Sequence, residues 1–75
     1  MIVLDTHIFV WLFDDKTKLT SRQLTEIEKN AGSIGVSIIS CWEIAKLVSL
    51  GRLLLGAPLK TWFEIALSPS GIHLL

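Results

Sequence analysis

The chain is short, apolar and without net charge: it has 75 residues, 51% of them hydrophobic, and its Lys and Arg residues equal its Asp and Glu residues in number. This length provides for one small domain, and the balanced charge excludes the strongly basic surface of a general nucleic-acid-binding protein. A domain this small and this apolar is expected to bury one face against a partner or against a further part of the same domain.

Other classes are excluded by simple patterns. Cys41 is the only cysteine, which excludes an intrachain disulfide and a cysteine-based zinc site. Asp5 interrupts the first apolar run, so no secretion signal is visible. The longest apolar run, residues 8–13, is far too short to span a membrane. We therefore expect a soluble, cytoplasmic protein.

The sequence begins with a predicted strand and a predicted helix. Residues 2–4 form a continuous apolar run, which is typical of a strand in a parallel sheet. Residues 8–13 follow at once and are apolar on every side, which predicts a helix that partly contacts another chain. Residues 14–16 are charged and predict a loop.

A second helix and a second strand come next. Thr20 and Gln23 have the spacing of a capping box, which predicts a helix start at this point. Gly32 follows that helix, at a position typical of a left-handed C-cap. Residues 33–38 alternate between small or polar and β-branched side chains, which favours a strand.

The last part of the chain predicts two helices and a third strand. Residues 39–50 predict a helix that ends at Gly51, Pro58 is predicted in the first turn of the next helix, and residues 72–75 predict a strand. Strands that alternate with helices indicate an α/β fold, a parallel sheet with helical crossovers. We expect about three strands and four helices.

Two acids are the candidate functional residues. Asp5 and Glu43 each follow a predicted strand, and open α/β sheets bind ligands at the carboxyl ends of their strands. Asp5 has two open interpretations: it caps the first helix, or it serves a metal while Thr6 is the cap. Glu43 also has two open interpretations: it serves the site, or it belongs to an ordinary polar helix face. Ser40, Glu43 and Lys46 recur at the spacing of such a face, which predicts a weak ion pair between Glu43 and Lys46.

The histidines and tryptophans favour structural roles. His7 and His73 lack metal-ligand spacing to each other or to the cysteine, which favours packing or surface positions for both. Trp11, Trp42 and Trp62 lie in apolar helical stripes, which favours the core or an interface over base stacking.

Several motifs in order resemble the PIN domain, and more closely the VapC-type toxins of toxin–antitoxin pairs. They are LDTH at residues 4–7, SIISCWEIA at 37–45, LGRL at 50–53, Trp62, and GIHLL at 71–75. The likeness covers essentially the whole chain.

The resemblance implies a Mg²⁺- or Mn²⁺-dependent endoribonuclease that hydrolyses RNA of the tRNA or rRNA class. Asp5 and Glu43 correspond to catalytic, metal-binding acids of that family, and Thr6 and Ser37 to supporting residues. Carboxylates suit such hard cations. A cognate antitoxin and a homodimer are the implied partners.

The family has further aspartates in the second half of its domain, which this sequence, ending at Leu75, does not contain. The expectation is an incomplete PIN-like domain, with residues 1–75 as its N-terminal part, inactive alone. The alternative is a non-catalytic α/β interaction module whose residues 8–13 dimerise or bind an antitoxin-like peptide. A domain of similar topology without metal or toxin history is the third possibility.

Overall fold

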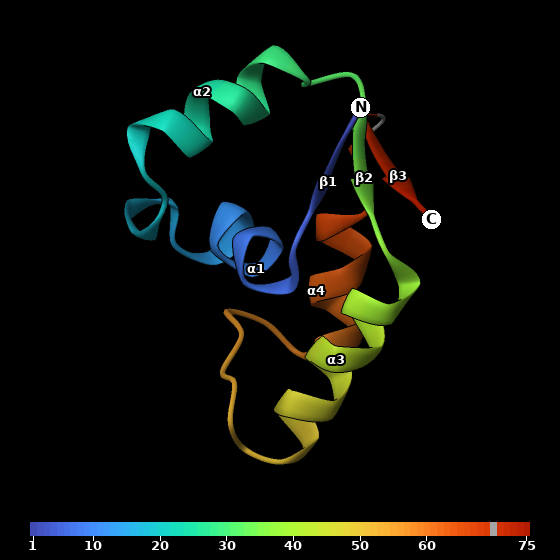
Figure 1. Cartoon of the computed structure of the whole chain (residues 1–75). Helices are drawn as coiled ribbons and strands as arrows, with labels where there is room; N and C mark the ends of the chain where they lie inside the picture. The colour runs from blue at the N-terminus through green and yellow to red at the C-terminus, as the bar shows by residue number, and fades with distance from the viewer. Residues whose placement is uncertain (70) are drawn as a thin grey trace.

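Three short parallel strands and the helices that connect them make up the fold, which a computed structural model describes for residues 1–69 and 71–75 (Figure 1). The elements in chain order are β1 (Ile2–Leu4), α1 (Thr6–Asp14), the 3-10 helix η1 (Lys16–Lys18), α2 (Ser21–Lys29), β2 (Ile34–Val36), α3 (Ile38–Ser49), α4 (Leu59–Ala66) and β3 (Ile72–Leu74). The predicted α/β class, with three strands and four α-helices, is confirmed.

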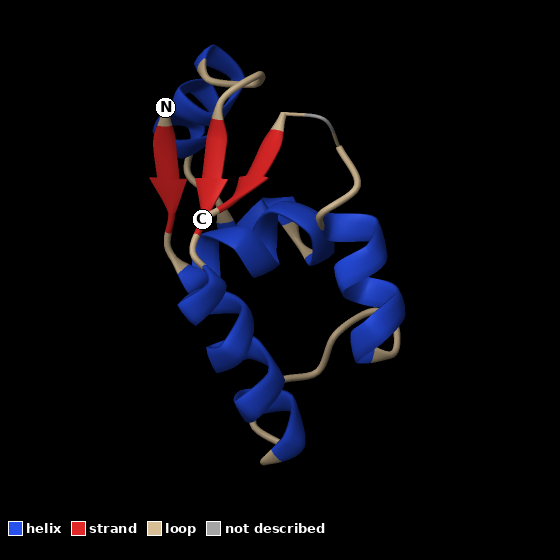
Figure 2. Cartoon of the chain, turned by 90° about the vertical axis from the view of Figure 1, so that its right-hand side faces the viewer, coloured by secondary structure: helices blue, strands red, loops and turns tan. Residues whose placement is uncertain are grey.

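The sheet has the order β1-β2-β3, and both neighbouring pairs are parallel. Ile34 pairs with Ile2 on one side and with Ile72 on the other. Figure 2 shows the three arrows running in the same direction. Their carboxyl ends therefore share one edge of the sheet, and α1 and α3 begin directly after β1 and β2 at that edge.

The two faces of the sheet differ in how they are covered. Leu4, Ile34 and Val36 point to one face and are buried in the core. Val3 and His73 lie at the register position of Gly35, on the other face, and both are exposed. In Figure 2 no helix of the described residues crosses in front of the strands. The helices therefore cover one face of this sheet.

Phe9 of α1 lies at the centre of the core and is fully buried. Its ring contacts the Trp62 and Phe13 rings edge to face, with centroid distances of 5.3 Å and 5.6 Å. Such contacts add to the free energy gained by burying aromatic area. The other buried apolar residues are Leu4, Val10, Leu19, Ile27, Ile34, Val36, Ile44, Trp62 and Ala66.

The predicted capping box at the start of α2 is confirmed. Thr20 Oγ1 accepts a hydrogen bond from the Gln23 backbone N–H at 3.1 Å, and Gln23 Oε1 accepts one from the Thr20 N–H at 2.9 Å. The predicted left-handed cap at Gly32 is wrong, because Asn30 is the C-cap. Among the described residues only Gly51, with φ of 68°, has a positive φ angle. Asn30 ends the helix because its amide donates back to the Glu26 carbonyl.

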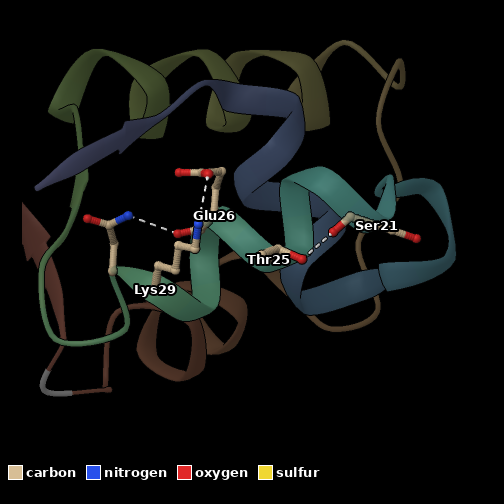
Figure 3. A network of polar contacts seen from close by, with 5 residues as sticks. Ser21, Thr25, Glu26 and Lys29 are labelled. Atoms are coloured by element: carbon tan, nitrogen blue, oxygen red, sulfur yellow. Dashed lines mark hydrogen bonds and ion pairs between the residues drawn. The ribbon is translucent and has the colours of Figure 1, made fainter.

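The outer face of α2 is polar and exposed to solvent (Figure 3). The Thr25 hydroxyl donates to the Ser21 carbonyl at 2.8 Å, and Lys29 pairs with Glu26 at 3.8 Å. An exposed pair of this kind contributes little to stability. The opposite face contributes Ile27 to the core.

Three boundaries differ from the predicted ones. The second strand is shorter, because Ser37 caps α3 and Ile38 is already helical. Pro58 is the N-cap of α4 and not a residue of its first turn. The predicted loop at residues 14–16 is reduced to Asp15, because Asp14 ends α1 and Lys16 begins the 3-10 helix η1.

The tryptophans have unequal surroundings: Trp62 is buried, Trp11 is half-buried and Trp42 is exposed. The predicted core position is therefore confirmed for Trp62, whereas for the exposed Trp42 the interface remains a prediction. His7 and His73 are both exposed, as predicted for surface residues.

None of the helices in the described part of the chain has the length and hydrophobicity to cross a membrane.

Candidate functional site

The Thr6 side chain connects the first turns of two helices. Its Oγ1 lies 3.0 Å from Ser40 Oγ and 3.2 Å from Glu43 Oε1. Thr6 and Ser40 are buried, whereas Glu43 is exposed. An ionised carboxylate only accepts hydrogen bonds and Thr6 has a single hydroxyl proton, so when Thr6 donates to Glu43 its contact with Ser40 requires Ser40 as the donor. We call Thr6, Ser40 and Glu43 the hydroxyl chain.

Asp5 caps α1. Its backbone is extended, and its Oδ1 accepts a hydrogen bond from the Ile8 N–H at 3.0 Å. The capping interpretation is thereby confirmed, and the assignment of the cap to Thr6 is wrong because Thr6 is already the first helical residue. The bond engages one carboxylate oxygen, so the exposed Asp5 side chain retains Oδ2 for another ligand.

Glu43 lies one turn into α3, at the same edge of the sheet. The Thr6 hydroxyl bonds to its Oε1, and the Glu43 side chain is exposed. The ion pair predicted between Glu43 and Lys46 is not among the ion pairs of residues 1–69 and 71–75. Lys46 Nζ lies instead 5.0 Å from the centroid of the Trp42 ring, where it makes a cation–π contact.

Ser37 and Ser40 have different roles at the start of α3. Ser37 Oγ accepts a hydrogen bond from the Ile39 N–H at 3.1 Å and is the N-cap. Ser37 thus starts the helix that carries Glu43. Ser40 was assigned only to a polar helix face, yet it is buried and contacts Thr6. The spacing of Ser40 and Glu43 shows only that they share a helix face, and the contact with Thr6 depends on how α1 and α3 pack.

The donor set of this edge consists of two carboxylates. In the part of the chain that the structure describes, no group of three His, Cys, Asp or Glu side chains is placed to hold a metal ion together. Mg²⁺ is commonly bound by one or two carboxylates and keeps several waters. Asp5 and Glu43 are carboxylates, the kind of ligand such a cation takes, and one oxygen of each is engaged in a hydrogen bond.

Two neighbouring features lie outside the site. Burial raises the pKa of the half-buried Cys41 thiol, which makes this cysteine a poor nucleophile and fits its predicted role as a small core residue. A groove of about 680 Å³ lies at the far end of α1, where Asp14 and Trp62 are among its lining residues. Because Asp5 and Thr6 are at the other end of α1, the groove is separate from the two acids.

No known family model matches this chain, and no curated protein or solved structure is significantly similar to it. The fold and the contacts around Thr6 are therefore the observations from which a function can be argued.

Proposed function

We propose that the chain is a VapC-like, PIN-type ribonuclease that binds Mg²⁺ or Mn²⁺ through Asp5 and Glu43. The hydrogen bond between Thr6 and Glu43 is the observation that carries this proposal. It joins the helix that follows β1 to the helix that follows β2; Asp5 directly precedes the first of these helices, and Glu43 belongs to the second. Such an edge is where parallel α/β sheets bind ligands.

The proposed chemistry follows from the two acids. A bound divalent cation would orient and activate water for attack on a phosphodiester and offset charge on the leaving oxygen. Asp5 is fixed by its own cap, and Glu43 is fixed by Thr6, so both carboxylates are oriented before a cation arrives. RNA of the tRNA or rRNA class is the proposed substrate, in the cytoplasm and under control of a cognate antitoxin.

Metal binding is the direct test. Titration of the ¹⁵N-labelled chain with Mn²⁺ should broaden the amide signals around Asp5 and Glu43, and Asp5→Asn should remove the effect. Glu64→Gln is the matched control, because Glu64 is an exposed acid on another helix, paired only with Lys60. Broadening that is uniform over the surface, or unchanged in Asp5→Asn, would contradict the proposal.

Cleavage by this chain alone is expected to be slow. The described residues bring two acids to the edge, and two-metal nucleases need more carboxylates than two to hold both ions. The test is hydrolysis of tRNA and rRNA with Mn²⁺ present. Rapid cleavage that Asp5→Asn abolishes would show that two acids suffice.

A second candidate function is an interaction module that forms a homodimer. Its support is an apolar patch on α3, formed by Ile38, Ile39 and Trp42, which are 61%, 66% and 63% exposed. Monomeric proteins rarely expose large side chains so close together. This surface is different from the helix at residues 8–13 that the sequence favoured, where Phe9 and Val10 are buried.

The oligomeric state tests this candidate. Sedimentation should give a dimer that Ile39→Lys converts to a monomer, whereas Leu54→Lys, at an exposed leucine outside the patch, should leave the dimer intact. A pure interaction module should also be indifferent to Mn²⁺ and to Asp5→Asn. A monomeric wild-type chain at high concentration would contradict the dimer.

A further inference from the structure

We infer that Ser40 is a positioning residue that fixes the Glu43 carboxylate through the Thr6 hydroxyl. Ser40 acts through Thr6: its Oγ lies 3.0 Å from Thr6 Oγ1, which lies 3.2 Å from Glu43 Oε1. Ser40 and Glu43 lie three residues apart on α3, so they share a face of that helix. The role in orienting a metal ligand rests on the proposed function, whereas the positioning itself does not.

The direction of the hydrogen bonds defines what Ser40 does. Thr6 has a single hydroxyl proton, and Glu43 can only accept it. If Ser40 donates to Thr6 Oγ1, the Thr6 proton is directed away from Ser40 and toward Glu43. Ser40 thus removes the competing orientation of the Thr6 hydroxyl, in which Thr6 would donate to Ser40 and leave Glu43 without a partner.

Burial makes this arrangement effective. Thr6 and Ser40 are 8% and 7% exposed, so little water can replace either hydroxyl. A hydrogen bond in such surroundings is stronger than one at the surface, and bonds in series strengthen one another. No buried side-chain oxygen or nitrogen of the described residues lacks a partner, which includes both hydroxyl groups. The hydroxyl chain can therefore hold Oε1 of the exposed Glu43 side chain in one position.

The positioning is testable without any metal. The measured quantity is the ¹³C chemical shift of the Glu43 carboxylate at neutral pH in the complete chain. Ser40→Ala should shift this signal, and Thr6→Val should shift it in the same direction. Ser49→Ala is the matched control: it is the same substitution on the same helix, and it removes a hydroxyl that donates only to the Lys46 carbonyl.

The double variant separates a chain of hydrogen bonds from two independent effects. Because Ser40 acts through Thr6, the shift in Ser40→Ala/Thr6→Val should equal that of Thr6→Val alone. Additive shifts, or a Glu43 signal that is unchanged in Ser40→Ala, would overturn the inference. Thermal melts of each variant identify any general loss of structure, and Thr6→Ser, which keeps the hydroxyl, should restore the wild-type signal.

Mn²⁺ affinity then tests the link to the proposed site. Loss of a residue that orients a metal ligand typically weakens affinity about 10- to 100-fold; we expect the lower end of this range for Ser40→Ala and no change for Ser49→Ala. Equal affinities of Ser40→Ala and wild type would overturn the metal role of Ser40. If the wild-type chain binds no Mn²⁺, the proposed function fails, and the carboxylate shifts alone still decide the positioning.

Discussion

Asp14 accepts a hydrogen bond of 2.7 Å from the indole Nε1 of Trp62, which lies far away in the sequence. The other carboxylate oxygen of Asp14 accepts a bond of 3.0 Å from the Gly56 backbone N–H. The last residue of α1 therefore fixes both the segment before α4 and the buried tryptophan of α4. Each bond is charge-assisted, and such bonds are stronger than neutral ones.

Loss of the Asp14 carboxylate should destabilise the fold. Asp14→Ala leaves the indole N–H of buried Trp62 without a partner, for which we expect a loss of about 1–3 kcal/mol in the free energy of unfolding. Asp14→Asn should lose less, because the amide oxygen can still accept one bond. Urea denaturation measures both. Glu64→Ala, at an exposed acid of α4, serves as the control, and an equal loss there would show that the Trp62 bond is not the cause.

Substitutions at Asp5 should separate its cap from its charge. Asparagine caps a helix about as well as aspartate, so Asp5→Asn should keep the stability of the wild type, whereas Asp5→Ala should lose about 1 kcal/mol. Both should lose Mn²⁺ binding under the proposed function. The measurements are thermal unfolding and Mn²⁺ titration. Retained Mn²⁺ binding in Asp5→Asn would separate this residue from the metal altogether.

Gly71 should not tolerate a side chain. A Cβ at this position would lie 2.0 Å from the Ala31 carbonyl oxygen, which belongs to the backbone and cannot turn away. We expect Gly71→Ala to destabilise the protein at the upper end of the ~1–3 kcal/mol typical of overpacking. Gly32→Ala is the matched control, since nothing lies within 4 Å of its Cβ. Equal unfolding midpoints for the two variants would contradict the close approach at Gly71.

Asp15 should contribute to the pH dependence of stability. The Thr17 hydroxyl donates to its carboxylate and lowers the pKa of Asp15 below its ordinary value of 3.8, with help from the Thr17 N–H and from Lys18. Because the folded-state pKa is the lower one, the stabilisation is present above pH 3.8 and is lost as the pH falls through the folded-state value.

The expected result is a shallower acid limb of the stability curve in Asp15→Asn than in the wild type. Unfolding midpoints measured across this acidic range give the comparison. Thr17→Val removes the main donor and should flatten the curve in the same way. A Thr17→Val curve parallel to that of the wild type would contradict the assigned cause.

The sequence predicts the elements well because they are encoded locally. The capping box of Thr20 and Gln23 and the helix end at Gly51 involve residues close in the chain, and both are present in the structure. The apolar run at residues 2–4 indicated a parallel strand for the same reason. Gly32 was misassigned because α2 ends two residues earlier, at Asn30. The side-chain amide of Asn30 donates a hydrogen bond to the Glu26 carbonyl of the preceding turn.

The site was predicted only in part because its contacts cross between helices. Asp5 and Glu43 follow strands, which is a local pattern, but the contact of Thr6 with Ser40 depends on how α1 and α3 pack. Asp14 was assigned to a loop, and nothing near it in the sequence indicates Trp62 as its partner. Long-range polar contacts of this kind depend on tertiary geometry that local patterns do not contain.

The parallel sheet also constrains the order of folding. Ile2 pairs with Ile34, and Ile34 pairs with Ile72, so each pairing waits until a complete helical crossover has closed on itself. Closing such loops has an entropic cost before any contact compensates for it. The helices, whose caps are local, can form earlier. The hydroxyl chain joins residues on either side of the first crossover, so the same late step that closes the ladder between β1 and β2 also brings Thr6 to Glu43.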